Sequence, residues 1–210
     1  MSEMIPYDIS RLLGGKGGVG KGAKLYVKYM VSLRCKAAVR SKFDEMKLPI
    51  RFSIHGGLEF EEEVSEIELN ELNNHLQNLG MVLLNEVESL KIERIINTII
   101  EIVHYTDKLP RMSFTNLIKE YTGKEQKTIL RNFSDVKGVS ILQFIIIQKI
   151  ERAKELLVYE DLTISEIVEI LNYKNEADFI NQFEKITGLD APYFQNMKKT
   201  RLKVSGYKQS

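Results

Sequence analysis

The stretch IQKIERAKELLVYEDLTISEIVEILNYKNEADFINQFEKITGLDAPYF, residues Ile147 to Phe194, decides the fold of this chain. Its first part places apolar residues three and four positions apart, which predicts a helix with one buried face. Asp161 or Thr163 begins a second helix that breaks at Asn172, and a third helix begins near Asn175. Two short helices joined by a tight turn, the second with a polar face, fit the major groove of DNA.

The third helix has two distinct faces. Phe179, Phe183 and Ile186 are four and three residues apart, so they must face the core together. Glu176 and Asp178 on this helix would repel phosphate, which predicts weak binding or an orienting role. The remaining polar face gives the DNA-contact candidates Asn175, Ala177, Asn181, Gln182 and Lys185.

The same stretch closely resembles the carboxy-terminal helix-turn-helix of AraC-type (AraC/XylS) transcription regulators. The resemblance rests on the strings I-x-x-A-x-x-L-L, T-I-S-E-I and Y-x-x-x-x-x-F-x-x-x-F-x-x-x-x-G-x-x-x-P-x-x-F. Matching positions are Ala153, Leu156, Leu157, Ile167, Tyr173, Phe179, Phe183, Gly188 and Pro192. The chain departs from the family's usual residues at Lys149, Val168, Asn172 and Gln195. The resemblance implies a bacterial DNA-binding regulator.

That family carries two such motifs, and residues 113–138 are the candidate for the first. Ser113 caps FTNLIKEY, Thr122-Gly123 ends it, and EQKTILRNF forms a reading helix that closes on Gly138. A helix from Ser140 to Val158, roughly 30 Å long at 1.5 Å per residue, joins the two motifs. Its length is close to the ~34 Å repeat of B-DNA. Contact candidates on the first reading helix are Lys124, Gln126, Lys127, Thr128, Arg131 and Asn132.

The front half predicts a ferredoxin-like arrangement. From Lys24 the order is strand 25–32, helix 35–46, strand 51–56, strand 58–64, helix 68–80 and strand 81–87. Ser65 and Glu68 form a capping box for the second helix. We expect the helices to cover one sheet face and leave the other open to a partner or a second copy.

LNNHLQNLGMVLL resembles the end of heavy-metal-associated domains, which bind soft metals through M-x-C-x-x-C. The chain offers Met30 and Cys35 near that place, but Ala38 stands three residues after Cys35. One thiolate cannot make a two-thiolate site, so a structural Cys35 is favoured over a metal ligand. His55, His75 and His104 have no ligand spacing that would replace the missing thiol. No metal or cofactor is therefore expected.

The glycine-rich start, GKGGVGK over Gly15 to Lys21, resembles the deviant phosphate loop of ParA and MinD type ATPases. Lys16 would be the signature lysine and Lys21 the phosphate-binding one. Gly22 replaces the hydroxyl residue that holds Mg²⁺, and a strand follows where a helix is needed. Residues 1–23 are therefore predicted to be a flexible leader that lacks packing residues.

The helix over residues 90–104 is apolar on more than one face. Its favoured interpretation is the first helix of the DNA-binding bundle, with one side buried. The alternative is that its second apolar face is the seam of a homodimer.

Charge and composition agree with this organisation. Residues 1–107 hold 13 Lys and Arg against 16 Asp and Glu, a net of −3, whereas residues 108–210 hold 17 against 13, a net of +4. The basic half is the predicted DNA-binding half. A single Cys and the absence of a leader or of a long apolar run predict a cytoplasmic protein without a membrane segment.

The sequence thus predicts an α+β chain with a leader (1–23), a ferredoxin-like βαββαβ domain (24–89), a double helix-turn-helix bundle (90–200) and a tail (201–210). The predicted function is non-enzymatic, sequence-specific binding of double-stranded DNA by a regulator of AraC type, with the front domain sensing a signal or mediating assembly. Three alternatives stay open: a nucleotide switch using Lys16 and Lys21, a soft-metal module at Cys35, and a protein-interaction domain. The effector cannot be read from the sequence.

Overall fold

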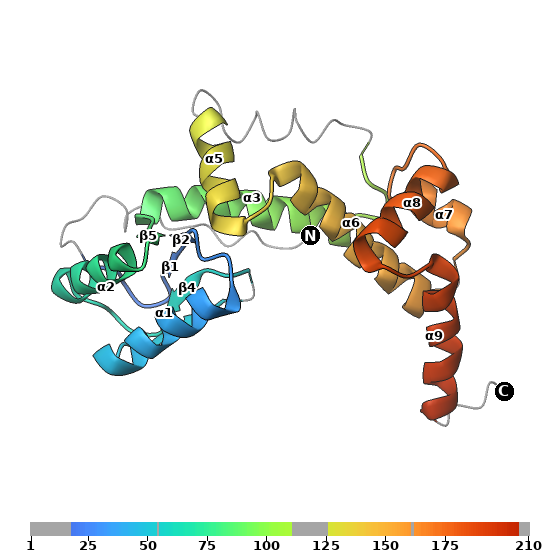
Figure 1. Cartoon of the computed structure of the whole chain (residues 1–210). Coiled ribbons are helices and arrows are strands. Elements are labelled where there is room, and N and C mark those ends of the chain that lie inside the picture. Colours follow the sequence, from blue (N-terminus) through green and yellow to red (C-terminus); the bar gives the residue numbers. More distant parts are fainter. Residues whose placement is uncertain (1–17, 54, 111–125, 161, 206–210) are drawn as a thin grey trace. The chain divides into compact units, whose positions relative to one another are not determined.

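The computed structural model describes residues 18–53, 55–110, 126–160 and 162–205, and it is mostly helical with two small sheets (Figure 1). The elements, in chain order, are β1 (Lys24–Leu25), β2 (Val27–Lys28), α1 (Leu33–Met46), β3 (Ile50–Phe52), β4 (Leu58–Phe60), α2 (Glu66–Asn78), β5 (Val82–Leu83), α3 (Glu86–Tyr105), α5 (Gln126–Lys137), α6 (Ile141–Tyr159), α7 (Ile164–Ile170), α8 (Glu176–Thr187) and α9 (Ala191–Val204).

The chain divides into two compact units. The first, which we call the sheet unit, holds the described residues up to Arg94 together with Lys127–Val139. The second, the helical unit, holds residues 95–110, Gln126 and the described residues from Ser140 onward. In this division α5 groups with the front of the chain, to which the sequence does not assign it.

The strands of the sheet unit are all antiparallel but shorter than their sequence pattern predicts. β4 lies between β1 and β3, and β2 pairs with β5. The first predicted strand is thus divided into β1 and β2. The last predicted strand, 81–87, stops at Leu83 because Asn85 accepts a hydrogen bond from the backbone N–H of Glu88 and begins α3.

One face of the strands packs against α1 and α2. Leu25 and Val27 alternate along the first strands, so both side chains enter one core, and Leu58 and Phe60 join it from β4. The helices add Val39, Phe43, Leu72 and Leu76. The predicted capping box starts α2: Ser65 Oγ accepts from the N–H of Glu68, and the Glu68 carboxylate accepts from the N–H of Ser65. Full burial of each such apolar side chain contributes roughly 1.5–3 kcal/mol to folding.

The other face is not open, contrary to the sequence-based expectation. Tyr26 is buried on it, and the Tyr26 N–H donates to Ser89 Oγ of α3 at 3.1 Å. Lys24 Nζ lies 2.7 Å from Glu93 Oε1, also on α3. In Figure 1, α3 runs on the side of the strands away from α1. The alternate residues Lys24, Tyr26 and Lys28 thus face helices that the sequence assigned to the DNA-binding half.

The described end of the predicted leader is part of the sheet unit. Val19 is buried and forms an isolated bridge with Val64. Gly18 approaches the same segment so closely that a Cβ atom would lie 2.3 Å from the Val64 carbonyl oxygen. Hydrophobic periodicity could not predict this contact between Val19 and Val64. A single β-bridge requires only one buried residue and one glycine, and these make no periodic pattern in the sequence.

The helical unit has the predicted connections. Ser140 caps α6, Thr163 and Glu166 form a capping box for α7, and α8 ends at Gly188 with φ 72°. The unit also contains α9, which begins at the N-cap Asp190 with Pro192 in its first turn. This helix continues to Val204, into the segment 201–210 that the sequence predicts to be a tail.

The part of α3 that belongs to the helical unit is the apolar helix of the sequence. Ile95, Ile96, Ile99 and Val103 are buried. His104 joins α3 to α6 through Gln148, with Nε2 and Oε1 3.1 Å apart. This supports the interpretation of a bundle helix with one buried side. Among the helices that the structure describes, none is long and apolar enough to cross a membrane.

Candidate nucleic-acid interface

The helix α8 presents its predicted polar face to solvent. Phe179 and Phe183 are fully buried, which turns Ala177, Asn181 and Lys185 outward, and all three are exposed. Figure 1 shows α7 and α8 beside one end of α6. Because positions 177, 181 and 185 follow each other at four-residue intervals, they form one continuous strip along the helix.

Two further candidates on α8 are held by other protein groups. Asn175 is the N-cap, and its Oδ1 accepts from the backbone N–H of Asp178 at 2.8 Å. Gln182 is half-buried, and its Oε1 accepts from the Tyr173 hydroxyl at 2.6 Å. The Gln182 side chain is therefore fixed in place before any ligand binds, and the amide nitrogen is its remaining donor.

Two departures from the AraC pattern support this arrangement. Lys149 Nζ lies 3.8 Å from the centre of the Tyr173 ring, and burial lowers the pKa of Lys149 to about 8. The Tyr173 ring thus contacts the Lys149 ammonium through its face, and the Tyr173 hydroxyl donates to Gln182. Asn172 has φ 49°, in the left-handed region where Asn is the best substitute for Gly.

The basic reading helix α5 also has a buried side and an exposed side. Ile129 and Phe133 are buried, whereas Lys127, Thr128 and Arg131 are exposed. The helix ends at Gly138, with φ 69°, as predicted. Lys124 and the side chain of Gln126 lie outside the described residues, as does the helix expected from Ser113.

Among the α5 candidates whose side chains the structure describes, Asn132 is the one placed inward. It is 5% exposed; its Oδ1 accepts from Lys28 Nζ at 2.7 Å, and its Nδ2 donates to Glu88 Oε1 at 3.1 Å. These contacts use the amide that a base contact would need. Asn132 is therefore a packing residue in this structure, because α5 has a partner on the side that the sequence left open.

Several contacts that sequence reasoning missed hold α5 within the sheet unit. Lys28 Nζ lies 3.6 Å from an Asp135 carboxylate oxygen, and the Tyr29 N–H donates to the Asp135 carbonyl at 2.8 Å. Lys137 Nζ donates to the His55 carbonyl at 2.8 Å. The available signal was the alternation of Lys24, Tyr26 and Lys28, which gives the first strand a second, polar but covered, face.

The start of α1 does not assemble a two-thiolate metal site. Ser32 Oγ lies 3.2 Å from Cys35 Sγ and also accepts from the Cys35 N–H at 3.2 Å, and these hydrogen bonds lower the pKa of the thiol. The residue beside Cys35 is thus Ser32, three positions before it, and not Ala38. No group of three or more potential metal ligands occurs among the described residues.

The glycine-rich loop uses its backbone donors within the fold. The Val19 N–H donates to the Val64 carbonyl at 2.9 Å, and the Gly22 N–H donates to the Phe60 carbonyl at 2.7 Å. Lys21 is exposed, β1 follows at Lys24 in place of a helix, and Lys16 lies outside the described residues. These two described donors are used within the fold and are therefore not free to cradle phosphate.

Comparison with known proteins agrees with the geometry of these helices. Residues 118–194 match a family described as "Helix-turn-helix domain". Among the curated proteins, none matches.

Three solved structures illustrate the structural similarity. The DNA-binding domain of the global transcriptional factor AdpA, solved with a target DNA, is 17% identical, with 53% of this chain and 95% of that chain covered and a TM-score of 0.45. For the C-terminal domain of the response regulator AraT from Geobacillus stearothermophilus, the values are 19%, 51%, 84% and 0.44. For the transcriptional regulator CdpR from Pseudomonas aeruginosa, they are 19%, 75%, 51% and 0.42.

The family match covers α5 to α8 and so includes both helices that the sequence predicts to read DNA. The match supports the role of a DNA-binding transcription regulator, and such regulators are not enzymes. Residues 118–194 of this chain therefore carry an AraC-type helix-turn-helix domain, a class that binds double-stranded DNA.

Proposed function

We propose that this protein is a sequence-specific transcription regulator of AraC type that reads DNA with α5 and α8. The single observation that carries the proposal is a pair of helices, each followed by a left-handed glycine and buried on one side, within the matched helix-turn-helix region. The proposed contact residues are Lys127, Thr128, Arg131, Ala177, Asn181, Gln182 and Lys185, with Lys124 and Gln126 from the sequence.

The two helices have different roles in this proposal. Lys127 and Arg131 are exposed cations on one face of α5, suited to phosphate and to the acceptor edge of guanine. On α8, Asn181 and the fixed Gln182 are amides suited to adenine. Glu176 and Asp178 lie in the first turn of α8, where carboxylates stabilise the helix dipole, so they are explained without a protein partner.

The front of the chain is proposed to act on α5 directly. Lys28, Tyr29 and the His55 carbonyl all contact α5 within the sheet unit. A change in the position of β2 or of the 53–57 turn would be transmitted to the helix that carries Arg131. This gives the sensing role a physical route.

We further propose that residues 24–89 form a ferredoxin-like domain. Its support is the order of elements and the pairing of β4 with β1 and β3, and of β2 with β5.

A homodimer would use the half-buried Ile100 and Ile102 of α3, and light scattering of wild type against an Ile102→Lys variant tests it. A regulator that binds a bacterial chromosome acts in the cytoplasm.

The decisive experiment is selection of bound duplexes from a random-sequence library, followed by fluorescence anisotropy at several salt concentrations. We expect a recurrent motif bound roughly 10³-fold or more tightly than unrelated DNA. Binding should weaken with salt, because phosphate contacts release counterions. The absence of any preferred sequence at moderate salt would overturn the proposal.

A matched pair of variants tests the placement of the interface. Arg131→Ala removes an exposed cation from α5, and a lost guanine or phosphate contact costs about 1–3 kcal/mol. Lys174→Ala removes an exposed cation that lies before α8, outside both reading helices. We expect a ~10-fold or larger loss of affinity for Arg131→Ala and little change for Lys174→Ala. Equal losses would place the interface elsewhere.

A further inference from the structure

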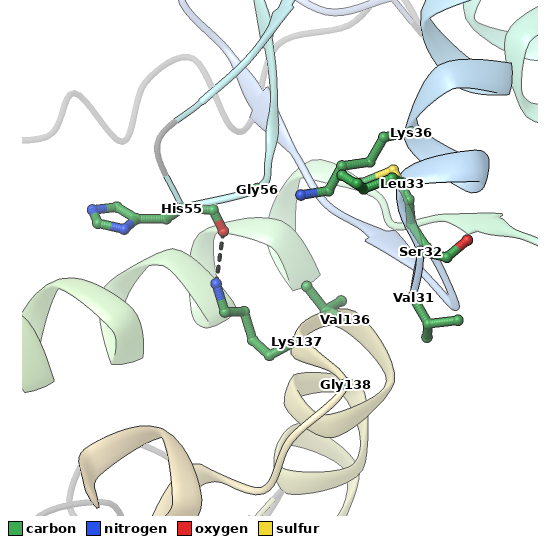
Figure 2. Close-up of a pocket in the computed structure, with 10 residues that line it drawn as sticks. Val31, Ser32, Leu33, Lys36, His55, Gly56, Val136, Lys137 and Gly138 are labelled. Atoms are coloured by element: carbon green, nitrogen blue, oxygen red, sulfur yellow. Dashed lines mark hydrogen bonds between the residues drawn. The ribbon is translucent and has the colours of Figure 1, made fainter. Parts of the chain in front are cut away.

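Each proposed reading helix has a half-buried polar side chain that bonds to a group outside the helix. Figure 2 shows the one on α5: the Lys137 ammonium donates to the His55 carbonyl at 2.8 Å. Lys137 is the last residue of α5, so this bond holds the end of the helix. The one on α8 is Gln182, beside the exposed Asn181. There the bond decides which end of an amide can face a ligand.

Tyr173, which precedes α8, holds a hydrogen-bond donor in a fixed position. Its backbone N–H donates to the Val168 carbonyl at 2.9 Å. Its ring meets the Phe179 ring edge-on, with 5.3 Å between ring centres, and Lys149 Nζ lies 3.8 Å from the centre of the Tyr173 ring. Burial raises the pKa of the Tyr173 hydroxyl, so the hydroxyl keeps its proton at neutral pH and remains a donor.

This hydroxyl engages the oxygen end of the Gln182 amide. The Tyr173 O–H donates to Gln182 Oε1 at 2.6 Å. The oxygen and nitrogen of an amide point to different sides of the same carbon, so a bond that holds Oε1 towards Tyr173 directs Nε2 away from it. The Gln182 side chain is half-buried and therefore still reaches the surface. The group that it offers to a ligand is the N–H donor.

A donor distinguishes the four bases in the major groove. Guanine presents two acceptors there, N7 and O6, and thymine presents the acceptor O4. Adenine presents an acceptor beside an amino donor, and cytosine presents an amino donor. A free glutamine matches adenine because it can donate and accept at the same time. Gln182 lacks the accepting half of that pair, because its oxygen is held by Tyr173.

We propose that Tyr173 is a positioning residue that makes Gln182 a donor-only reader, which selects guanine first and thymine second over adenine and cytosine. The inference rests on the proposed DNA-binding function and leaves the recognition of adenine on α8 to Asn181. Lys149 and Phe179 take part indirectly, because they hold the ring that carries the donor.

The first arm of the test is NMR of the full-length protein without DNA. We expect a slowly exchanging Tyr173 hydroxyl proton with a cross-peak to the Gln182 side chain. Tyr173→Phe removes the hydroxyl and keeps the ring, so the side-chain amide signals of Gln182 should shift while α8 stays folded. Tyr193→Phe removes an exposed hydroxyl of α9 and should leave these signals unchanged. Unchanged Gln182 signals in Tyr173→Phe, or equal shifts in Tyr193→Phe, would overturn the positioning role.

The second arm selects duplexes from a random-sequence library with each variant. The position that Gln182 reads is the one whose base preference disappears in Gln182→Ala. Wild type should prefer guanine to adenine there by about tenfold, and in Tyr173→Phe the preference should fall to about threefold or less, because the released amide can also accept. Gln182→Glu keeps an acceptor for Tyr173 but replaces the outer donor with a carboxylate oxygen, so cytosine should become the preferred base. Tyr193→Phe should select the wild-type motif.

The outcomes separate this inference from the proposed function. A wild-type protein that selects no motif overturns the proposed function and, with it, the reading role of Gln182. A motif that is unchanged in Gln182→Ala shows that Gln182 reads no base. Adenine as the preferred base, or a guanine preference that survives Tyr173→Phe, overturns the donor-only assignment while specific DNA binding stands.

Discussion

The two reading helices differ in what holds them. α8 rests on an aromatic cluster inside its own unit, with Phe183 5.5 Å from Phe179 and 5.2 Å from Phe194 between ring centres. On α5, Ile129 and Phe133 are buried. Its polar contacts are with Lys28, Tyr29 and the His55 carbonyl, which belong to the front of the chain. The helix with more exposed positive charge is thus the one held by polar contacts with the front of the chain.

This difference separates scaffold from control. An aromatic cluster is non-polar and closely packed, so its geometry responds little to a ligand or to salt. The hydrogen bonds and ion pairs that join α5 to one face of a small sheet can instead be made with other polar groups, so they can break and reform. We infer that α8 provides a fixed reference on the DNA and that regulation acts through α5.

Loss of the aromatic cluster gives the largest expected effect. Phe183→Ala should destabilise the helical unit by about 3–5 kcal/mol, since a fully buried aromatic ring leaves a cavity. NMR during urea unfolding should show α8 lost first while the sheet unit, with α5, persists. Phe133→Ala should give the reverse order, and Lys185→Ala should change neither. Simultaneous loss of both units in Phe183→Ala would mean that the two helices share one scaffold.

The buried amide on α5 gives the next effect. Asn132→Leu removes one partner of Lys28, which keeps its ion pair with Asp135, and one partner of Glu88, and the loss of such buried hydrogen bonds costs about 1–3 kcal/mol. We expect lower stability of the sheet unit with the same selected DNA motif. Arg131→Leu, on the exposed side, should change stability by less than about 0.5 kcal/mol but weaken DNA binding. Unchanged stability with an altered motif would make Asn132 a base-reading residue.

Much of this organisation could be predicted because local signals suffice for it. Capping residues such as Ser65, Ser140 and Thr163 act on the first turn of the helix that follows them. Gly138 and Gly188 end their helices through a local backbone conformation that does not depend on tertiary packing. The position of α5 was not predictable in this way. Its contact with Lys28 joins residues more than a hundred positions apart, and Asn132 at a reading-helix position looks the same in sequence whether it faces DNA or Glu88.

Lys149 of α6 gives a smaller, pH-dependent effect on the stability of the helical unit. Its pKa is about 8 in the folded protein against an ordinary 10.5, so between these values the folded state binds fewer protons than the unfolded state. Burial of the charged form therefore lowers stability below pH 8, and this penalty disappears as the pH rises towards 10.5. The Tyr173 ring offsets part of it by about 1–2 kcal/mol.

The comparison of Lys149→Met with wild type isolates this group. We expect the variant to be about 1–2 kcal/mol more stable at pH 7, with a smaller difference at pH 9.5, in urea unfolding followed by circular dichroism. Lys154→Met on the same helix, whose ammonium pairs with Glu151, controls for other titrating groups. If the difference in unfolding free energy between Lys149→Met and wild type does not change with pH, burial does not disfavour the charged form of Lys149.

The smallest effect separates capping from recognition at the start of α8. Asn175→Ala removes the acceptor for the Asp178 N–H and should cost about 1 kcal/mol, whereas Asn175→Ser restores a capping oxygen and should cost a few tenths. If Asn175 serves α8 only as a cap, DNA affinity in Asn175→Ser should equal that of wild type, measured by anisotropy on the selected motif. A serine variant with wild-type stability and a tenfold loss of affinity would instead give Asn175 a direct contact. It would also extend the fixed surface of α8 to its N-cap, because the same side chain would then cap the helix and read the DNA.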